Sequence, residues 1–128
     1  MGESDMSITN EGIEAEKLAR PILQKQGFCI QQLDWIGCKN NKWLIFEIKQ
    51  RELFNPPPFL GTGLDIRQID LRRKLYNELL IDTYLMVFEK KTKNIYGQFL
   101  FGKLENGVCF DTKNKIRIYP IKNFDKLC

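Results

Sequence analysis

The fold of this chain is decided at positions 43–49, which read Trp43-Leu44-Ile45-Phe46-Glu47-Ile48-Lys49. Branched and aromatic residues favour a β-strand here, and side chains two positions apart in a strand point to the same face. Leu44, Phe46 and Ile48 therefore share one face. Glu47 and Lys49 lie side by side on the opposite face. The segment predicts a strand that carries a carboxylate and an ammonium group at one place.

A second short apolar segment, residues 28–36, comes before this strand, and the polar residues 39–42 between them are typical of a turn. The two segments are predicted to form an antiparallel hairpin, which would make Asp34 and Glu47 near neighbours. Two carboxylates at one place favour a hard cation, Mg²⁺ or Mn²⁺, and Lys49 would then contact the attacking water or a phosphate. The alternative interpretation of Glu47 and Lys49 is a simple ion pair on a solvated strand.

Two helices are predicted from apolar residues at helical spacing. The first begins near Glu11 and stops at Gly27, with a kink or a break at Pro21. The second begins at Asp65, which can cap it, and ends near Leu80. We expect its apolar residues to face inward and its basic residues to face mostly outward, namely Arg67, Arg72, Arg73 and Lys74. Residues 1–10 are polar and acidic and are predicted to be a disordered tail before a single domain at 11–128.

The rest of the chain is predicted to be loop and strand. Residues 53–63 contain three successive prolines, which offer no backbone donors, and are therefore expected to form a loop. Strands are expected at 83–89, 95–104, 108–110 and 115–119. This order of elements is typical of an α/β fold with a central mixed sheet flanked by helices and with additional antiparallel strands at the C-terminal end.

The composition excludes several kinds of chemistry. The chain has 128 residues, 43% of them hydrophobic, which suits one domain with a full core. It has no histidine, so Ser-His-Asp sites, Cys-His sites and histidine-ligated zinc are excluded. The four cysteines lack CxxC spacing and no secretory leader is recognisable, which predicts reduced thiols in a cytoplasmic protein. The apolar runs are too short to cross a bilayer, so no membrane partner is expected.

The charge is unevenly distributed along the chain. The net charge is +4, but all 20 basic residues follow a strongly acidic N-terminal segment that contains Glu3, Asp5, Glu11, Glu14 and Glu16. The remainder is therefore more basic than the total suggests. A small basic domain of this kind attracts polyanions, of which nucleic acid is the commonest.

Taken in order, these motifs resemble those of the PD-(D/E)XK nucleases, and among them the archaeal-type Holliday junction resolvases. The resemblance covers roughly residues 11–89, and Leu33 stands where the signature has proline. It lies in four segments: Glu11-Gly12-Ile13-Glu14-Ala15-Glu16, Gln26-Gly27-Phe28, Asp34 with the hydrophobic pair after it, and Phe46-Glu47-Ile48-Lys49. The resemblance implies a restriction-endonuclease-like core.

The resemblance also implies an active site and a reaction. The site residues would be Glu16, Asp34, Glu47 and Lys49, with Glu14 as the nearest competitor for the role of Glu16. Asp34, Glu47 and the backbone carbonyl of Ile48 would hold Mg²⁺ or Mn²⁺, and Glu16 would bind a second ion or a metal-bound water. Lys49 would orient the water or stabilise the transition state. The reaction would be hydrolysis of a phosphodiester bond.

Several basic or polar residues are candidates for contacts with DNA phosphates, and the alternative for each is a solvated surface. These are Gln50, Arg51, Arg67, Arg72, Arg73 and Lys74. The leading hypothesis is a DNA endonuclease, structure-specific for branched or duplex DNA and acting as a homodimer. The alternatives are a nicking or single-strand nuclease of a mobile element or repair system, and a nucleic-acid-binding or assembly subunit without catalysis.

Overall fold

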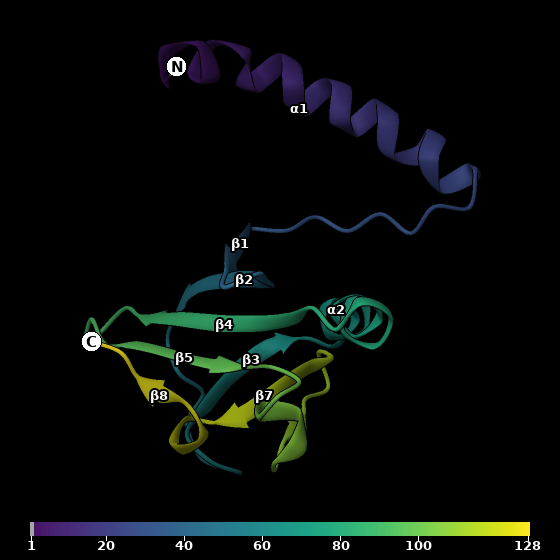
Figure 1. The fold of residues 1–128 in the computed structure, drawn as a ribbon. Coiled ribbons are helices and arrows are strands. Elements are labelled where there is room, and N and C mark those ends of the chain that lie inside the picture. The colour runs from purple at the N-terminus through teal and green to yellow at the C-terminus, as the bar shows by residue number, and fades with distance from the viewer. Residues whose placement is uncertain (1) are drawn as a thin grey trace. The chain divides into compact units, whose positions relative to one another are not determined.

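The computed structural model describes the backbone of residues 2–128 and the side chains from residue 12 onward. The chain divides into two compact units, Met1–Gln32 and Leu33–Cys128. The first unit contains helix α1, and the second contains helix α2 and all the strands described below (Figure 1). The predicted α/β class with a mixed sheet is confirmed.

Helix α1 (Gly2–Lys25) begins well before the predicted start at Glu11, so residues 2–10, predicted to be a disordered tail, are helical. The helix continues through Pro21 as one element and ends before Gly27, whose φ of 92° suits glycine. Neither described helix is long and apolar enough to cross a membrane.

The larger sheet has the strand order β1-β2-β4-β5-β8 (Figure 1). Strands β2 and β4 are parallel, while every other neighbouring pair in this sheet is antiparallel. Helix α2 (Ile66–Leu79) lies between β2 and β4 in sequence, as a parallel connection requires. The strands are β1 (Trp35–Lys39), β2 (Lys42–Arg51), β4 (Asp82–Glu89), β5 (Ile95–Phe99) and β8 (Asp125–Lys126).

A second, antiparallel sheet has the order β3-β7-β6. Its strands are β3 (Gly61–Asp65), β6 (Phe110–Asp111) and β7 (Ile116–Pro120), with short 3-10 turns η1 (Leu104–Asn106) and η2 (Ile121–Asn123) beside them. The predicted loop at 53–63 is therefore wrong at its end, where β3 begins. A side chain on Gly63 would lie 1.6 Å from the Arg117 carbonyl oxygen, so glycine permits the close pairing of β3 with β7.

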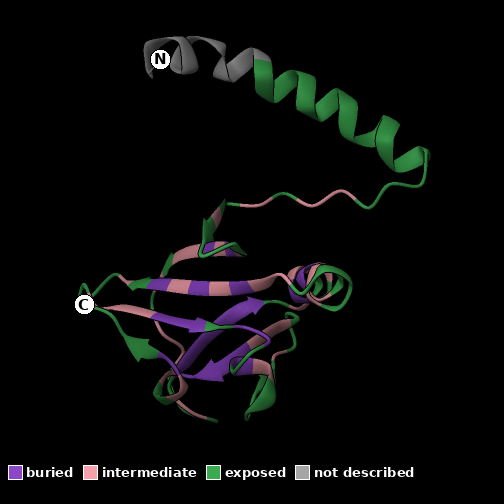
Figure 2. Cartoon of the chain, in the orientation of Figure 1, coloured by how far each residue is buried: buried purple, intermediate pink, exposed green. Residues whose placement is uncertain are grey.

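The core of the second unit lies between the two sheets and α2. Buried and half-buried residues alternate along β4, with Leu85 and Val87 turned into this core (Figure 2). Ile69 of α2, Leu64 of β3 and Tyr119 of β7 belong to the same cluster. In β2, Glu47 pairs with Leu85 and Lys49 pairs with Val87. Because paired residues of parallel strands share a face, Glu47 and Lys49 also point to this side of the sheet.

Candidate active site

The β1–β2 hairpin places Asp34 beside the segment that contains Glu47 and Lys49. Trp35 pairs with Phe46 across the hairpin, and Asp34 immediately precedes Trp35. The backbone N–H of Ile48 donates a hydrogen bond of 2.9 Å to Asp34 Oδ2. The first carboxylate is thus held at the backbone between the two charged residues of β2.

Glu47 is buried and its two carboxylate oxygens have different neighbours. Only 1% of the residue is exposed. Its Oε1 accepts from two nitrogens of Arg72, Nη2 at 2.5 Å and Nε at 3.2 Å. Its Oε2 lies 3.9 Å from Lys49 Nζ, and the Lys49 side chain is 28% exposed. The ion pair of Glu47 with Arg72 is therefore an internal one, and Lys49 lies where the pair approaches solvent.

Arg72 does not face outward, as the sequence had suggested, and with 2% exposure it is not accessible to DNA phosphates. The reason is its position on α2: Ile69, Arg72 and Tyr76 are three and four residues apart and share the face that packs on the sheet. This spacing was the signal that the sequence analysis missed. An arginine at a core position requires a buried acid as its partner, and Glu47 interrupts an otherwise apolar strand.

Two other predicted DNA contacts are engaged within the protein. Arg73 donates to Glu105 at 2.5 Å and lies 5.1 Å from the centre of the Phe101 ring. Arg51 donates to the Gly63 carbonyl oxygen at 3.0 Å, and burial lowers the pKa of its guanidinium. Gln50, Arg67 and Lys74 are exposed.

Glu16 and Glu14 both lie on α1, in the first unit, and both are exposed. The predicted role of Glu16 stays a prediction.

Asp34 and Glu47 fit a partly hydrated Mg²⁺ or Mn²⁺ ion better than a metal ion that is held by protein side chains alone. Among the residues that the structure describes, no group of three or more His, Cys, Asp or Glu side chains is gathered closely enough to hold a metal by itself. Mg²⁺, however, is usually bound by one or two carboxylates and keeps several waters. Asp34 is exposed and Glu47 Oε2 faces Lys49, so these donors fit a partly hydrated Mg²⁺ or Mn²⁺ ion.

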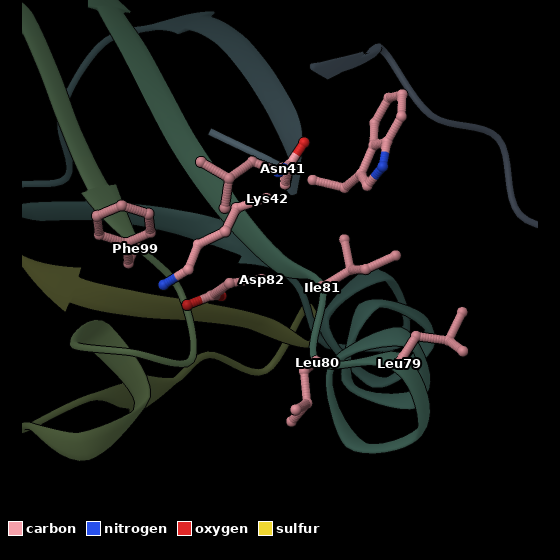
Figure 3. A pocket seen from close by; sticks show the side chains of 9 residues that line it. Asn41, Lys42, Leu79, Leu80, Ile81, Asp82 and Phe99 are labelled. Atoms are coloured by element: carbon pink, nitrogen blue, oxygen red, sulfur yellow. The ribbon is translucent and has the colours of Figure 1, made fainter. Parts of the chain in front are cut away.

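A separate cavity of about 710 Å³ opens at the other end of β2 (Figure 3). Figure 3 shows the Lys42 side chain directed towards Asp82. The Asp82 carboxylate accepts from the backbone N–H groups of Thr83, Phe101 and Gly102, so its role is to hold the turn after β5. The cavity contains none of the predicted site residues. It is lined by Asn41, Lys42, Trp43, Leu44, Leu79, Leu80, Ile81, Asp82 and Phe99.

A second cluster of charges is centred on Glu105, the middle residue of η1. Its Oε1 accepts from Arg73 at 2.5 Å and from Arg117 at 2.9 Å. Its Oε2 accepts from Arg117 at 3.1 Å and from the Tyr119 hydroxyl at 2.5 Å. Burial opposes ionisation of Glu105, but these three partners outweigh it and leave the pKa of the carboxyl below its ordinary value. The cluster joins α2, η1 and β7.

No protein-family model matches the chain, and no curated protein matches it. Among solved structures, the chain is similar to Hjc of Archaeoglobus fulgidus, a Holliday junction resolvase from an archaeal hyperthermophile. The two chains are 11% identical, the match covers 71% of this chain and 72% of that chain, and the TM-score is 0.43. The similarity is one of fold alone.

Proposed function

We propose that this chain is a metal-dependent DNA endonuclease that hydrolyses phosphodiester bonds. The observation that carries the proposal is the hydrogen bond from Ile48 N–H to Asp34 Oδ2. It holds an exposed carboxylate, at the residue before β1, against the segment of β2 that carries a buried carboxylate and a half-buried ammonium group. With a divalent cation bound to the carboxylates, this set of groups could neutralise and orient a phosphate without histidine, of which the chain has none.

The residues of the second unit would divide the work. Asp34, Glu47 through Oε2, and the Ile48 carbonyl would hold Mg²⁺ or Mn²⁺. A bound ion of this kind polarises a phosphate and lowers the pKa of a bound water. Lys49 is exposed enough to donate a hydrogen bond to a phosphate oxygen or to the attacking water, and its charge would stabilise the negative charge that develops in the transition state.

DNA is the proposed partner, bound as branched or duplex DNA in the cytoplasm. Exposed Gln50, Arg67 and Lys74 support phosphate contacts, which carry no sequence information. Arg51, Arg72 and Arg73 are left out of this surface because they contact groups of the protein itself. We propose a homodimer, since cutting both strands of a duplex or junction calls for two sites.

The test is cleavage of supercoiled plasmid and of a panel of junction, flap, duplex and single-stranded substrates. We expect cleavage with Mg²⁺ or Mn²⁺ and none with a chelator. Asp34→Ala and Lys49→Ala should each abolish cleavage, because each removes a group that contacts the ion or the phosphate. Asp70→Ala, which removes an exposed acid of α2, is the matched control and should cut as the parent does. An Asp34→Ala variant that folds by circular dichroism and cuts at the parental rate would refute the proposal.

The predicted role of Glu16 is tested in the same assay. Glu16→Gln should lose most cleavage and keep its melting temperature, while Glu14→Gln should change neither. An inactive Glu14→Gln beside a fully active Glu16→Gln would mean that the resemblance has been aligned in the wrong helical register.

A second candidate function is a nucleic-acid-binding or assembly subunit without catalysis. The observation that favours it is the Arg72 guanidinium on Glu47, which already supplies a positive charge to the carboxylate that a metal would use. The plasmid and substrate panel separates the two. A binding subunit would bind DNA in a gel-shift assay and would cut none of the substrates with Mg²⁺ or with Mn²⁺. A nicking or single-strand nuclease would cut only the corresponding member of the panel.

A further inference from the structure

The contact between Arg72 and Glu47 is asymmetric in a way that a simple ion pair does not require. An arginine and a carboxylate often meet as two parallel hydrogen bonds that use both carboxylate oxygens. Here Nε and Nη2 of Arg72 both donate to one oxygen, Oε1. The other oxygen, Oε2, is left towards Lys49, whose Nζ lies 3.9 Å away.

Both partners are fixed in place. Glu47 is 1% exposed and Arg72 is 2% exposed. Glu47 is held in the middle of β2, which pairs with β1 on one side and with β4 on the other. Arg72 is held by α2, one turn after the fully buried Ile69. Since a guanidinium is planar and its donors have a fixed geometry, the arrangement restricts rotation of the Glu47 carboxylate.

We propose that Arg72 is a positioning residue: it holds Glu47 by Oε1 so that Oε2 alone is presented, on the side of Lys49, to a divalent cation that Asp34 would also bind. This inference rests on the proposed function, because it assigns Arg72 to the same metal site. The role differs from a DNA contact, since the buried guanidinium acts through Glu47 and not on a phosphate.

The role predicts a loss of metal affinity that can be measured without DNA. Hydrogen-bond partners of ligating side chains commonly change metal affinity by about 10–100-fold when they are replaced. Arg72→Lys keeps the charge but lacks the planar fork, and Arg72→Gln keeps a planar donor but lacks the charge. We expect each to bind Mn²⁺ about tenfold or more weakly than the parent, measured by isothermal titration calorimetry on the full chain.

Arg73→Lys is the matched control. It makes the same chemical change at the next residue of α2, in the ion pair with Glu105, and should leave Mn²⁺ affinity unchanged. Circular dichroism and thermal melting identify the variants that fold, and the comparison uses whichever of Arg72→Lys and Arg72→Gln is folded. A folded Arg72 variant with parental Mn²⁺ affinity overturns the proposal.

A double-mutant cycle separates positioning from a general effect on the fold. In a Glu47→Gln background, Arg72→Lys should cause no further loss of Mn²⁺ affinity, because the oxygen it positions is no longer a carboxylate oxygen. In an Asp34→Asn background, the loss due to Arg72→Lys should persist. An undiminished loss in the Glu47→Gln background would overturn the positioning role.

The failure of this inference is distinguishable from failure of the proposed function. A parent chain that binds Mn²⁺ through Asp34 and Glu47 but cuts no DNA would refute the proposed endonuclease activity. The double-mutant cycle on Mn²⁺ affinity would still test the positioning role of Arg72. A parent that cuts DNA while the folded Arg72→Lys keeps full Mn²⁺ affinity would refute the positioning role alone. A parent that binds no Mn²⁺ would refute both.

Discussion

The Glu105 cluster allows the most quantitative prediction, for the substitution Glu105→Gln. The side chain is 10% exposed and accepts from Arg73, Arg117 and Tyr119. Glutamine has almost the same shape, so packing is preserved and the charge is removed. Whichever way the new amide is turned, its NH₂ group faces donors, because both Oε1 and Oε2 accept from the protein.

The size of the effect follows from the exposure of each partner. The Arg73 side chain is 38% exposed, so its pair with Glu105 contributes at most about 1 kcal/mol. Arg117 keeps a second partner, Asp111, at 2.8 Å. The Tyr119 hydroxyl matters most because the residue is fully buried, and a hydrogen bond to a charged group contributes about 1.5–3 kcal/mol. Glu105→Gln should therefore lower the free energy of unfolding by about 2–4 kcal/mol.

Urea unfolding at pH 7 measures this difference, with Glu78→Gln as the control. Glu78 is exposed in the last turn of α2, so that variant should match the parent. The pKa of Glu105 is lowered in the folded state, so its stabilisation is present above the unfolded pKa of about 4.3 and is lost as the pH falls through the folded pKa. The difference in free energy of unfolding between the parent and Glu105→Gln should hence become smaller as the pH is lowered from 7 to 3. A Glu105→Gln variant as stable at pH 7 as Glu78→Gln would refute the reasoning.

Two further predictions concern the backbone. Gly63→Ala would place its Cβ 1.6 Å from the Arg117 carbonyl oxygen, so we expect this variant to lose the β3–β7 pairing and to be unfolded by circular dichroism. The control is Gly12→Ala, whose Cβ would meet no described atom within 4 Å and which should fold as the parent does. Asp82→Asn replaces one of the carboxylate oxygens that accept from the backbone N–H groups of Thr83, Phe101 and Gly102. It should lower the free energy of unfolding by about 1–3 kcal/mol in the same urea assay. An unchanged free energy of unfolding would mean that the turn after β5 does not depend on Asp82.

Features that depend on neighbouring residues could be predicted from the sequence. The Asp65 side chain accepts from the Arg67 backbone N–H, which is the expected cap, and α2 follows as Ile66–Leu79. The tight turn at 39–42 joins β1 and β2, so the approach of Asp34 to the β2 backbone follows from the hairpin itself. In each case the residues that decide the structure are close in sequence: Asp65 and Arg67 are two positions apart, and the turn at 39–42 joins the two strands of the hairpin.

Features that depend on distant pairing could not be predicted in the same way. Gly61 and Gly63 have low strand propensity, yet they lie in β3, which pairs with β7 far along the chain. A Cβ at either glycine would clash with the backbone of β7. The place of Arg72 likewise depends on how α2 packs on the sheet, which its own composition of charged residues conceals. The Glu47–Arg72 pair could be predicted only from two observations together: Arg72 lies three residues after Ile69, on the buried face of α2, and Glu47 is an isolated acid in an apolar strand.

The buried Glu47–Arg72 pair also constrains how the sequence can change over evolutionary time. The two positions are 25 residues apart, yet loss of either partner alone breaks a buried ion pair, at a cost of about 3–5 kcal/mol. Replacement of both by apolar residues of similar volume is often neutral or stabilising. The two positions are therefore expected to covary. A lineage that abandons the acid at position 47 should lose the arginine at position 72 with it, so the arginine marks the sequences in which that acid is retained.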